Sequence, residues 1–350
     1  MGDFYDGTKL LSMSDLNGRQ PDIYLSTGNR SIGKTTWFNR YFVKDFKTKH
    51  KKFCLVYRWN YELSDCADKF FKDIHGLFFP EYTMTSKSEA KGIYHNLFYQ
   101  KNDSDKVVHC GYAVSLNNVD QLKKSSHLFS DTMAMLFDEF QSETNHYCSD
   151  EVSKLISLHT SVARGQGQMV RYVPVYMLGN PVTLLNPYYV EMDISTRLNA
   201  NARFLRGPGF VLEQGHNDAA QTAQEESGFN AAFIRNKYTA YAGQGAYLED
   251  NTAFIEEPKG RKRYLSTISY KGTQYALRSY DEAGVIYCDK RVDSSYPNRI
   301  AVTTDDHQIN YVMLKNNDMF IQQMRFYFDR GCFRFKDLQC KEAVMKMLSY

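Results

Sequence analysis

The segment Gly28–Thr35, which reads Gly-Asn-Arg-Ser-Ile-Gly-Lys-Thr, constrains this chain more than any other feature. It matches the pattern of Gly, any four residues, Gly, Lys and then Ser or Thr, and it follows the short apolar run Ile23–Leu25. In such a loop the backbone N–H groups turn toward a β-phosphate, Lys34 reaches the β- and γ-phosphates, and the Thr35 hydroxyl ligates Mg²⁺. The pattern therefore predicts a nucleotide site with contacts from Gly28, Asn29, Arg30, Ser31, Ile32, Gly33, Lys34, Thr35 and Thr36.

The first half of the chain alternates between strand and helix patterns. Short and nearly continuous apolar runs, typical of strands that are buried on both faces, occupy residues 23–26, 53–57, 107–114, 133–137 and 173–178. Longer stretches with helical character lie between them, for example residues 35–47 and 150–163. This alternation predicts an α/β domain with a mostly parallel sheet.

The apolar run Met133–Phe137 ends in Asp138 and Glu139, about a hundred residues after the phosphate loop. We expect Asp138 to ligate Mg²⁺ and Glu139 to polarise the attacking water as the general base. An acid pair in this position favours an ATP hydrolase. A nucleotide kinase is the alternative enzyme, and it would need a second basic pocket for its acceptor, which the sequence does not identify.

Three further residues are candidates for contact with the phosphates. Asn180 follows the run 173–178 and could bond the γ-phosphate or the attacking water, or it could simply cap a turn. Arg30, inside the loop, could add positive charge over the β- and γ-phosphates. Arg164 stands between a helical stretch and a glycine-rich turn, from which it could enter a neighbouring subunit's site or remain a solvated surface arginine.

The length of 350 residues predicts more than one domain. We expect the nucleotide-binding domain in residues 1–200, a linker or lid in 201–245, and a smaller α+β domain in 246–350, with hairpins followed by helices at 309–329 and 338–348. A hydrophobic content of 43% excludes a disordered chain, and the seven scattered cysteines suggest neither a disulfide framework nor a zinc site. No apolar run approaches 18 residues and the first residues are acidic, which favours a cytosolic protein without membrane contact.

Charge is unevenly distributed along the chain. The net charge is +3, but residues 259–350 contain 16 basic and 10 acidic residues, so the remainder of the chain is net negative. A polyanion would be attracted to the C-terminal part.

Several segments together resemble the DNA-packaging ATPases, or encapsidation proteins, of small podophages with protein-primed linear genomes. They are the phosphate loop, residues 55–63 (LVYRWNYEL), 136–140 (LFDEF), 178–188 (LGNPVTLLNPY) and 303–306 (TTDD). The resemblance spans most of the chain and is densest between residues 24 and 190.

The resemblance implies an additional-strand, catalytic-glutamate ATPase domain and a C-terminal domain like an RNase H-fold nuclease that no longer cuts. It further implies a homopentameric ring that docks on the portal of a procapsid and moves double-stranded DNA inward using ATP and Mg²⁺, with a scaffold RNA as a further candidate partner. The protein would act in the cytoplasm of the infected bacterial host, transiently on the procapsid, without entering the virion. The matched positions are Lys34 and Thr35 in the phosphate loop, Asp138 and Glu139 as the metal ligand and base, Arg164 as the arginine finger acting in trans, and Asn180 as the sensor.

The role of the C-terminal part is less constrained by its sequence. Six acids could form a two-metal nuclease site, namely Asp281, Glu282, Asp289, Asp293, Asp305 and Asp306. The basic and aromatic residues around them better suit contacts with a DNA backbone or the portal. The sequence is also compatible with a helicase or translocase that does not package DNA, with a terminase-type protein that has an active nuclease, and with a passive nucleic-acid-binding protein whose phosphate loop is degenerate.

Overall fold

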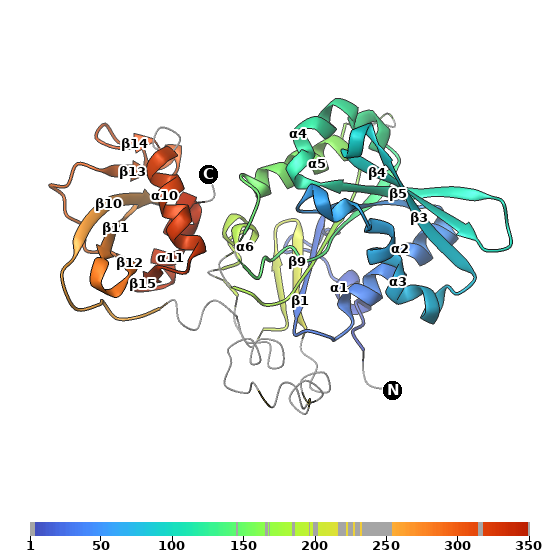
Figure 1. Ribbon diagram of the computed structural model, residues 1–350, viewed down its shortest axis with the longest axis horizontal. Helices are drawn as coiled ribbons and strands as arrows, with labels where there is room; N and C mark the ends of the chain where they lie inside the picture. Colours follow the sequence, from blue (N-terminus) through green and yellow to red (C-terminus); the bar gives the residue numbers. More distant parts are fainter. Residues whose placement is uncertain are drawn as a thin grey trace. The chain divides into compact units, whose positions relative to one another are not determined.

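The computed structural model divides the chain into two compact units (Figure 1). The first comprises residues 1–141, 151–181 and 199–246, and the second comprises 142–150, 182–198 and 247–350. Within these limits the structure describes residues 4–144, 146–164, 167, 169–183, 186–195, 197–198, 202–215, 222, 227, 232, 254–313 and 318–348.

A nine-stranded sheet forms the centre of the first unit as far as it is described, in the order β3-β4-β5-β2-β6-β7-β1-β9-β8. The run from β5 to β9 is parallel throughout, whereas β3, β4 and β8 are antiparallel to their neighbours. The strands are β1 (Ile23–Gly28), β2 (Lys52–Tyr57), β3 (Tyr82–Glu89), β4 (Tyr94–Lys101), β5 (Val107–Ser115), β6 (Thr132–Phe137), β7 (Val175–Gly179), β8 (Phe204–Gly207) and β9 (Phe210–Gly215).

The strand order confirms the expected fold class. The predicted strands correspond to β1, β2, β5, β6 and β7, and the mostly parallel sheet is present. Strand β7 lies between β1, which leads into the phosphate loop, and β6, which leads into Asp138. It is the additional strand that the resemblance implies. The sequence does not predict the hairpin β3–β4, because its alternating, half-exposed residues give no continuous apolar run.

Among its described residues, the first unit contains the helices α1 (Thr8–Leu11), α2 (Lys34–Lys49), α3 (Cys66–Phe78), α4 (Val119–Leu122) and α5 (Glu151–Val162). Helix α2 fixes the position of the phosphate loop because it begins at Lys34 and buries Phe38, Phe42, Val43 and Phe46 at helical spacing. These side chains belong to one core cluster with residues of α3 and of the sheet strands. The N-terminus of α2 is thereby held at the carboxyl end of β1.

The second unit contains a six-stranded sheet in the order β14-β13-β10-β11-β12-β15 among its described residues. Strands β10, β11 and β12 are antiparallel, and β13 and then β14 add in parallel beside β10, as expected for an RNase H-like domain. The bounds are β10 (Arg263–Tyr270), β11 (Thr273–Tyr280), β12 (Val285–Asp289), β13 (Arg299–Ala301), β14 (Val312–Met313) and β15 (Phe333–Phe335).

Helices α10 (Asp318–Asp329) and α11 (Leu338–Leu348) pack on this sheet through a core that includes Ile268, Leu277, Met324, Val344 and Met347. The helix predicted over 309–329 is too long, since β14 occupies its first part. Valine and methionine fit either pattern there, and pairing of β14 with β13 selects the strand.

The unit boundaries differ from the expected one at 200, whereas the second unit resumes at residue 247, next to the expected start at 246. Strands β8 and β9 extend the first sheet to Gly215, because Ile23–Gly28 pairs with Phe210–Gly215 along its whole length. Residues 182–198, which include α6 (Pro187–Glu191), belong to the second unit. There Lys341 Nζ donates to Thr183 Oγ1 at 3.1 Å, and Lys271 Nζ pairs with Asp193 Oδ1 at 2.8 Å. Most of the remaining expected linker lies outside the described residues.

No described helix combines the length and apolar character needed to cross a membrane.

Candidate nucleotide-binding site

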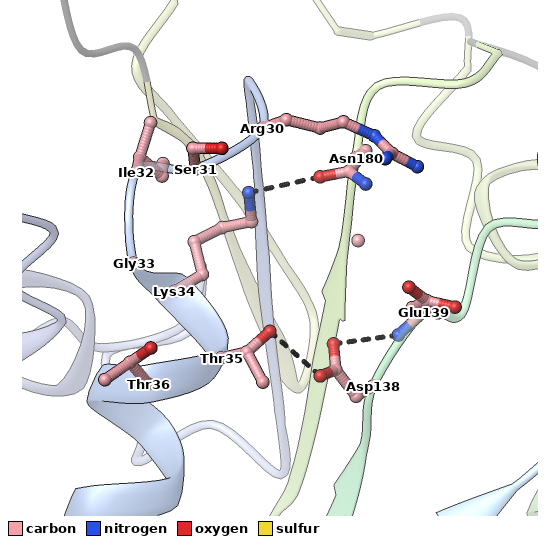
Figure 2. Close-up of a pocket in the computed structure, with 11 residues that line it drawn as sticks. Arg30, Ser31, Ile32, Gly33, Lys34, Thr35, Thr36, Asp138, Glu139 and Asn180 are labelled. Atoms are coloured by element: carbon pink, nitrogen blue, oxygen red, sulfur yellow. Dashed lines mark hydrogen bonds between the residues drawn. The ribbon is translucent and has the colours of Figure 1, made fainter. Parts of the chain in front are cut away.

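A cavity of about 280 Å³ lies at the carboxyl ends of β1, β6 and β7 (Figure 2). Parallel strands bring their carboxyl ends to one edge of the sheet, which is where ligands bind in open α/β folds. The cavity brings together nearly all of the residues predicted to contact the nucleotide and its metal. It is lined by Arg30, Ser31, Ile32, Gly33, Lys34, Thr35, Thr36, Asp138, Glu139, Gly179 and Asn180.

The loop requires glycine at both ends for different reasons. Gly28 ends β1, where a Cβ atom would lie 2.4 Å from the backbone oxygen of Gly215 on β9. Gly33 precedes α2 with φ of 91°, in the left-handed region that side chains other than glycine rarely adopt. The chain thus turns sharply enough to present the N–H groups of the first turn of α2 to the cavity, where they favour an anion.

Lys34 is only 6% exposed, and its ammonium group is held by the loop itself. Nζ donates to the backbone oxygens of Gly28 at 2.9 Å and Asn29 at 3.2 Å, and it lies 3.4 Å from Asn180 Oδ1. Burial lowers the pKa of Lys34 to about 8, and the nearby carboxylate of Asp138 partly opposes this shift. A phosphate group would supply the negative charge that the buried ammonium group needs.

Thr35 and Asp138 meet across the mouth of the cavity. Thr35 Oγ1 donates to Asp138 Oδ2 at 2.9 Å, and the Glu139 backbone N–H donates to Asp138 Oδ1 at 2.9 Å (Figure 2). Burial raises the pKa of Asp138, and these hydrogen bonds act in the opposite direction. A hydroxyl and a carboxylate side by side form an oxygen donor set that suits Mg²⁺, which takes few protein ligands and keeps several waters.

Glu139 follows β6 in the left-handed region, with φ of 57°. This conformation is uncommon for a residue with a side chain and persists where surrounding contacts hold it. The next residue supplies one such contact, because Phe140 N donates to the backbone oxygen of Leu178 on β7 at 3.0 Å. The turn leaves the Glu139 side chain exposed at the cavity.

Arg58, just after β2, is a residue of the site to which the sequence alone assigns no role. It is 8% exposed, and its Nη1 and Nη2 donate to the backbone oxygens of Glu139 at 3.3 Å and Phe140 at 2.8 Å. Its Nε donates to Glu151 Oε2 at 2.8 Å, and Glu151 is 3% exposed at the start of α5. Arg58 therefore ties the turn that carries Glu139 to both β2 and α5. The sequence signal that could have pointed to Arg58 is its position directly after a buried strand.

Arg164 does not line the cavity of its own chain. It is exposed two residues beyond α5. Arg171 is buried and anchors the chain near Arg164. Its backbone N–H donates to the backbone oxygen of Ala163 at 2.8 Å. Its guanidinium group donates to the backbone oxygens of Val162 at 2.7 Å and Thr132 at 3.1 Å. Arg164 is thus presented to solvent from an anchored base.

The six acids of the C-terminal part do not form a metal site. Asp289 is buried and pairs with Arg278 and Arg291, while Asp306 accepts hydrogen bonds from the backbone of Lys271 and Gly272. Asp281 and Glu282 are exposed in a short helical turn after β11. In the part of the chain that the structure describes, no three His, Cys, Asp or Glu residues are placed to hold a metal ion.

The lowered pKa of Lys34 predicts proton uptake when a nucleoside triphosphate binds at alkaline pH. At pH 9 an amine with a pKa of about 8 is mostly neutral, and bound phosphates favour the ammonium form, so close to one proton should be taken up per nucleotide. At pH 7 the amine is already charged and uptake should be small. Calorimetry in buffers of different ionisation enthalpy measures this. The same proton uptake at both pH values would contradict the prediction. As a control, Lys44→Met, at an exposed lysine of α2, should leave the proton uptake unchanged.

Comparison with known proteins identifies relatives over nearly the whole chain. Residues 2–349 match the family described as podovirus DNA encapsidation protein (Gp16). The DNA packaging protein of Bacillus phage phi29 is 24% identical over 336 residues, which cover 95% of this chain and 93% of that protein. The DNA packaging protein of Bacillus phage B103 is 24% identical over 333 residues, which cover 92% of this chain and 94% of that protein.

Two solved structures share the fold. The bacteriophage Phi-29 viral genome packaging motor assembly matches with a TM-score of 0.55 and 22% identity, over 99% of this chain and all of that one. The Phi-28 gp11 DNA packaging motor matches with a TM-score of 0.59 and 14% identity, over 100% of this chain and 98% of that one. With the match over residues 2–349, the chain belongs to the podovirus DNA encapsidation protein family.

Proposed function

We propose that this protein is an ATP hydrolase that works as a homomeric ring and drives double-stranded DNA into a procapsid. One observation carries the proposal: the Thr35 hydroxyl and the Asp138 carboxylate meet at 2.9 Å in the cavity that also contains Lys34 and Glu139. Membership of the encapsidation family, and the names of its phage relatives as DNA packaging proteins, support DNA as the cargo. The place of action is then the infected host cell, on the procapsid.

Five residues of the cavity have separate roles in this reaction. The N–H groups of the loop and the first turn of α2 hold the β-phosphate, and Lys34 turns from its backbone partners to the β- and γ-phosphates. Glu139 accepts a proton from the attacking water, and Asn180 orients that water or the γ-phosphate. Thr35 and Asp138 would hold Mg²⁺, whose charge offsets the charge that develops on the transferred phosphoryl group.

Arg164 is proposed to act on the site of a neighbouring subunit. Its exposure and the anchored base of its loop support this role, since a guanidinium entering a second active site must project from its own chain. Hydrolysis would then depend on ring assembly, which prevents futile turnover by free subunits.

DNA and the portal are the proposed partners of the ring. The net charge of +6 over residues 259–350 supports contact of the second unit with phosphate groups. The separate locations of the six acids do not favour a nuclease, so the proposed role of this unit is binding.

Glu139→Gln should bind ATP with nearly unchanged affinity but hydrolyse it at least about a hundredfold more slowly, because the amide cannot accept the proton of the water. Steady-state phosphate release and equilibrium nucleotide binding measure the two effects. Glu81→Gln, in an exposed glutamate of the same unit, is the control. Turnover close to that of the natural protein would show that another group is the base.

Arg164→Ala and Glu139→Gln should each form inactive rings, and rings that mix the two variants should recover part of the ATPase activity. A mixed interface can pair an intact Glu139 in one subunit with an intact Arg164 in the next, which neither pure ring can do. If Arg164 acts only within its own chain, mixing restores nothing. Phosphate release from DNA-bound rings, mixed at several ratios, distinguishes the two cases.

Arg58→Met should lower the rate of ATP hydrolysis, because the turn that carries Glu139 loses its hydrogen bonds from Arg58. The single variant leaves Glu151 buried without this partner, which costs about 3–5 kcal/mol of stability. The double variant Arg58→Met/Glu151→Met removes both charges, so its melting temperature should recover while its turnover stays low. Recovery of turnover together with stability would mean that Arg58 has only a structural role.

A further inference from the structure

The N-terminal segment is fastened to the phosphate loop by Tyr5. Its backbone N–H donates to the backbone oxygen of Ile32 at 2.8 Å. Its hydroxyl donates to Glu213 Oε2 at 2.8 Å and accepts from Ser26 Oγ at 2.9 Å. The ring packs against Trp37 and Phe38, with centroids 6.1 and 6.0 Å away. Tyr5 thus holds the chain in a fixed place beside the loop.

Phe4, immediately before this anchor, has an exposed ring at the loop. It is 76% exposed, and a Cβ atom built on Gly33 would lie 3.6 Å from Phe4 Cδ1. A single exposed apolar residue needs no explanation on a protein surface. This one differs because the buried contacts of Tyr5 hold it against the loop that is to receive the phosphates.

The direction of a bound nucleotide follows from the cavity. Asp138, Glu139 and Asn180 mark the end for the γ-phosphate, and Gly33 and Thr36 lie on the opposite side (Figure 2). We therefore expect the α-phosphate, ribose and base to leave the cavity on the side of Gly33, and Phe4 lies next to Gly33.

We propose that Phe4 forms the base subsite of this nucleotide site, where the base of a purine nucleoside triphosphate stacks on its ring. This inference rests on the proposed ATPase function. Stacking on an aromatic face tolerates any base and favours the larger ring system. The subsite should therefore bind ATP and GTP similarly and both more tightly than CTP or UTP.

The test compares ligands with and without a base. In equilibrium competition assays, Phe4→Ala should weaken ATP binding roughly tenfold, as expected for the loss of one base–aromatic stack, and leave inorganic tripolyphosphate binding unchanged. It should also reduce the preference for purine over pyrimidine triphosphates. Phe4→Trp should retain the affinity for ATP. The control Leu77→Ala, at an apolar residue of α3 that is 72% exposed, should change the affinity for neither ATP nor tripolyphosphate.

Two results would overturn the base subsite while leaving the proposed function intact. One is unchanged ATP binding by Phe4→Ala. The second is an equal loss of ATP and tripolyphosphate binding, which would mean that Phe4 only supports the loop. Failure of the natural protein to bind ATP would overturn the proposed function and the base subsite together.

Discussion

The hydrogen bond between Thr35 Oγ1 and Asp138 Oδ2 is the contact on which the remaining arrangement depends. It joins the helix after β1 to the turn after β6, two strands that are separated in the sheet by β7. The two residues can meet only because all three strands are parallel and end at the same edge. The same geometry places Asn180, after β7, beside Lys34. The relative positions of Thr35, Asp138, Lys34 and Asn180 are therefore consequences of one strand order.

The site contains buried charges that need partners. The Lys34 ammonium group is held by backbone oxygens in the cavity, and the lowering of its pKa by burial reflects the cost of charging it there. Arg58 and Glu151 pair with each other, and the remaining donors of Arg58 bond the turn at Glu139. A buried pair of this kind contributes little net stability against apolar residues of the same size. Its presence is better explained by the fixed position that it gives the turn at Glu139.

The sequence predicts well which residues meet at the cavity, and it predicts the long-range contacts poorly. The loop, Asp138, Glu139 and Asn180 can be found because each directly follows an apolar strand, and the carboxyl ends of parallel strands meet. Arg58 and Phe4 cannot be assigned, since their places depend on contacts with residues that are distant in the chain. For the same reason the expected boundary near 200 is wrong: β9 joins the first sheet by pairing with β1, and residues 182–198 pack with the second unit.

The central claim is that this cavity hydrolyses ATP in order to move DNA. Its most direct test is phosphate release by the purified protein, measured alone, with double-stranded DNA, and with DNA and procapsids together, while entry of DNA is followed by its protection from added nuclease. The account predicts low activity alone, stimulation by DNA, and protected DNA only when ATP is hydrolysed in the presence of procapsids. Protection of DNA without hydrolysis, or hydrolysis that neither DNA nor procapsids change, would contradict it.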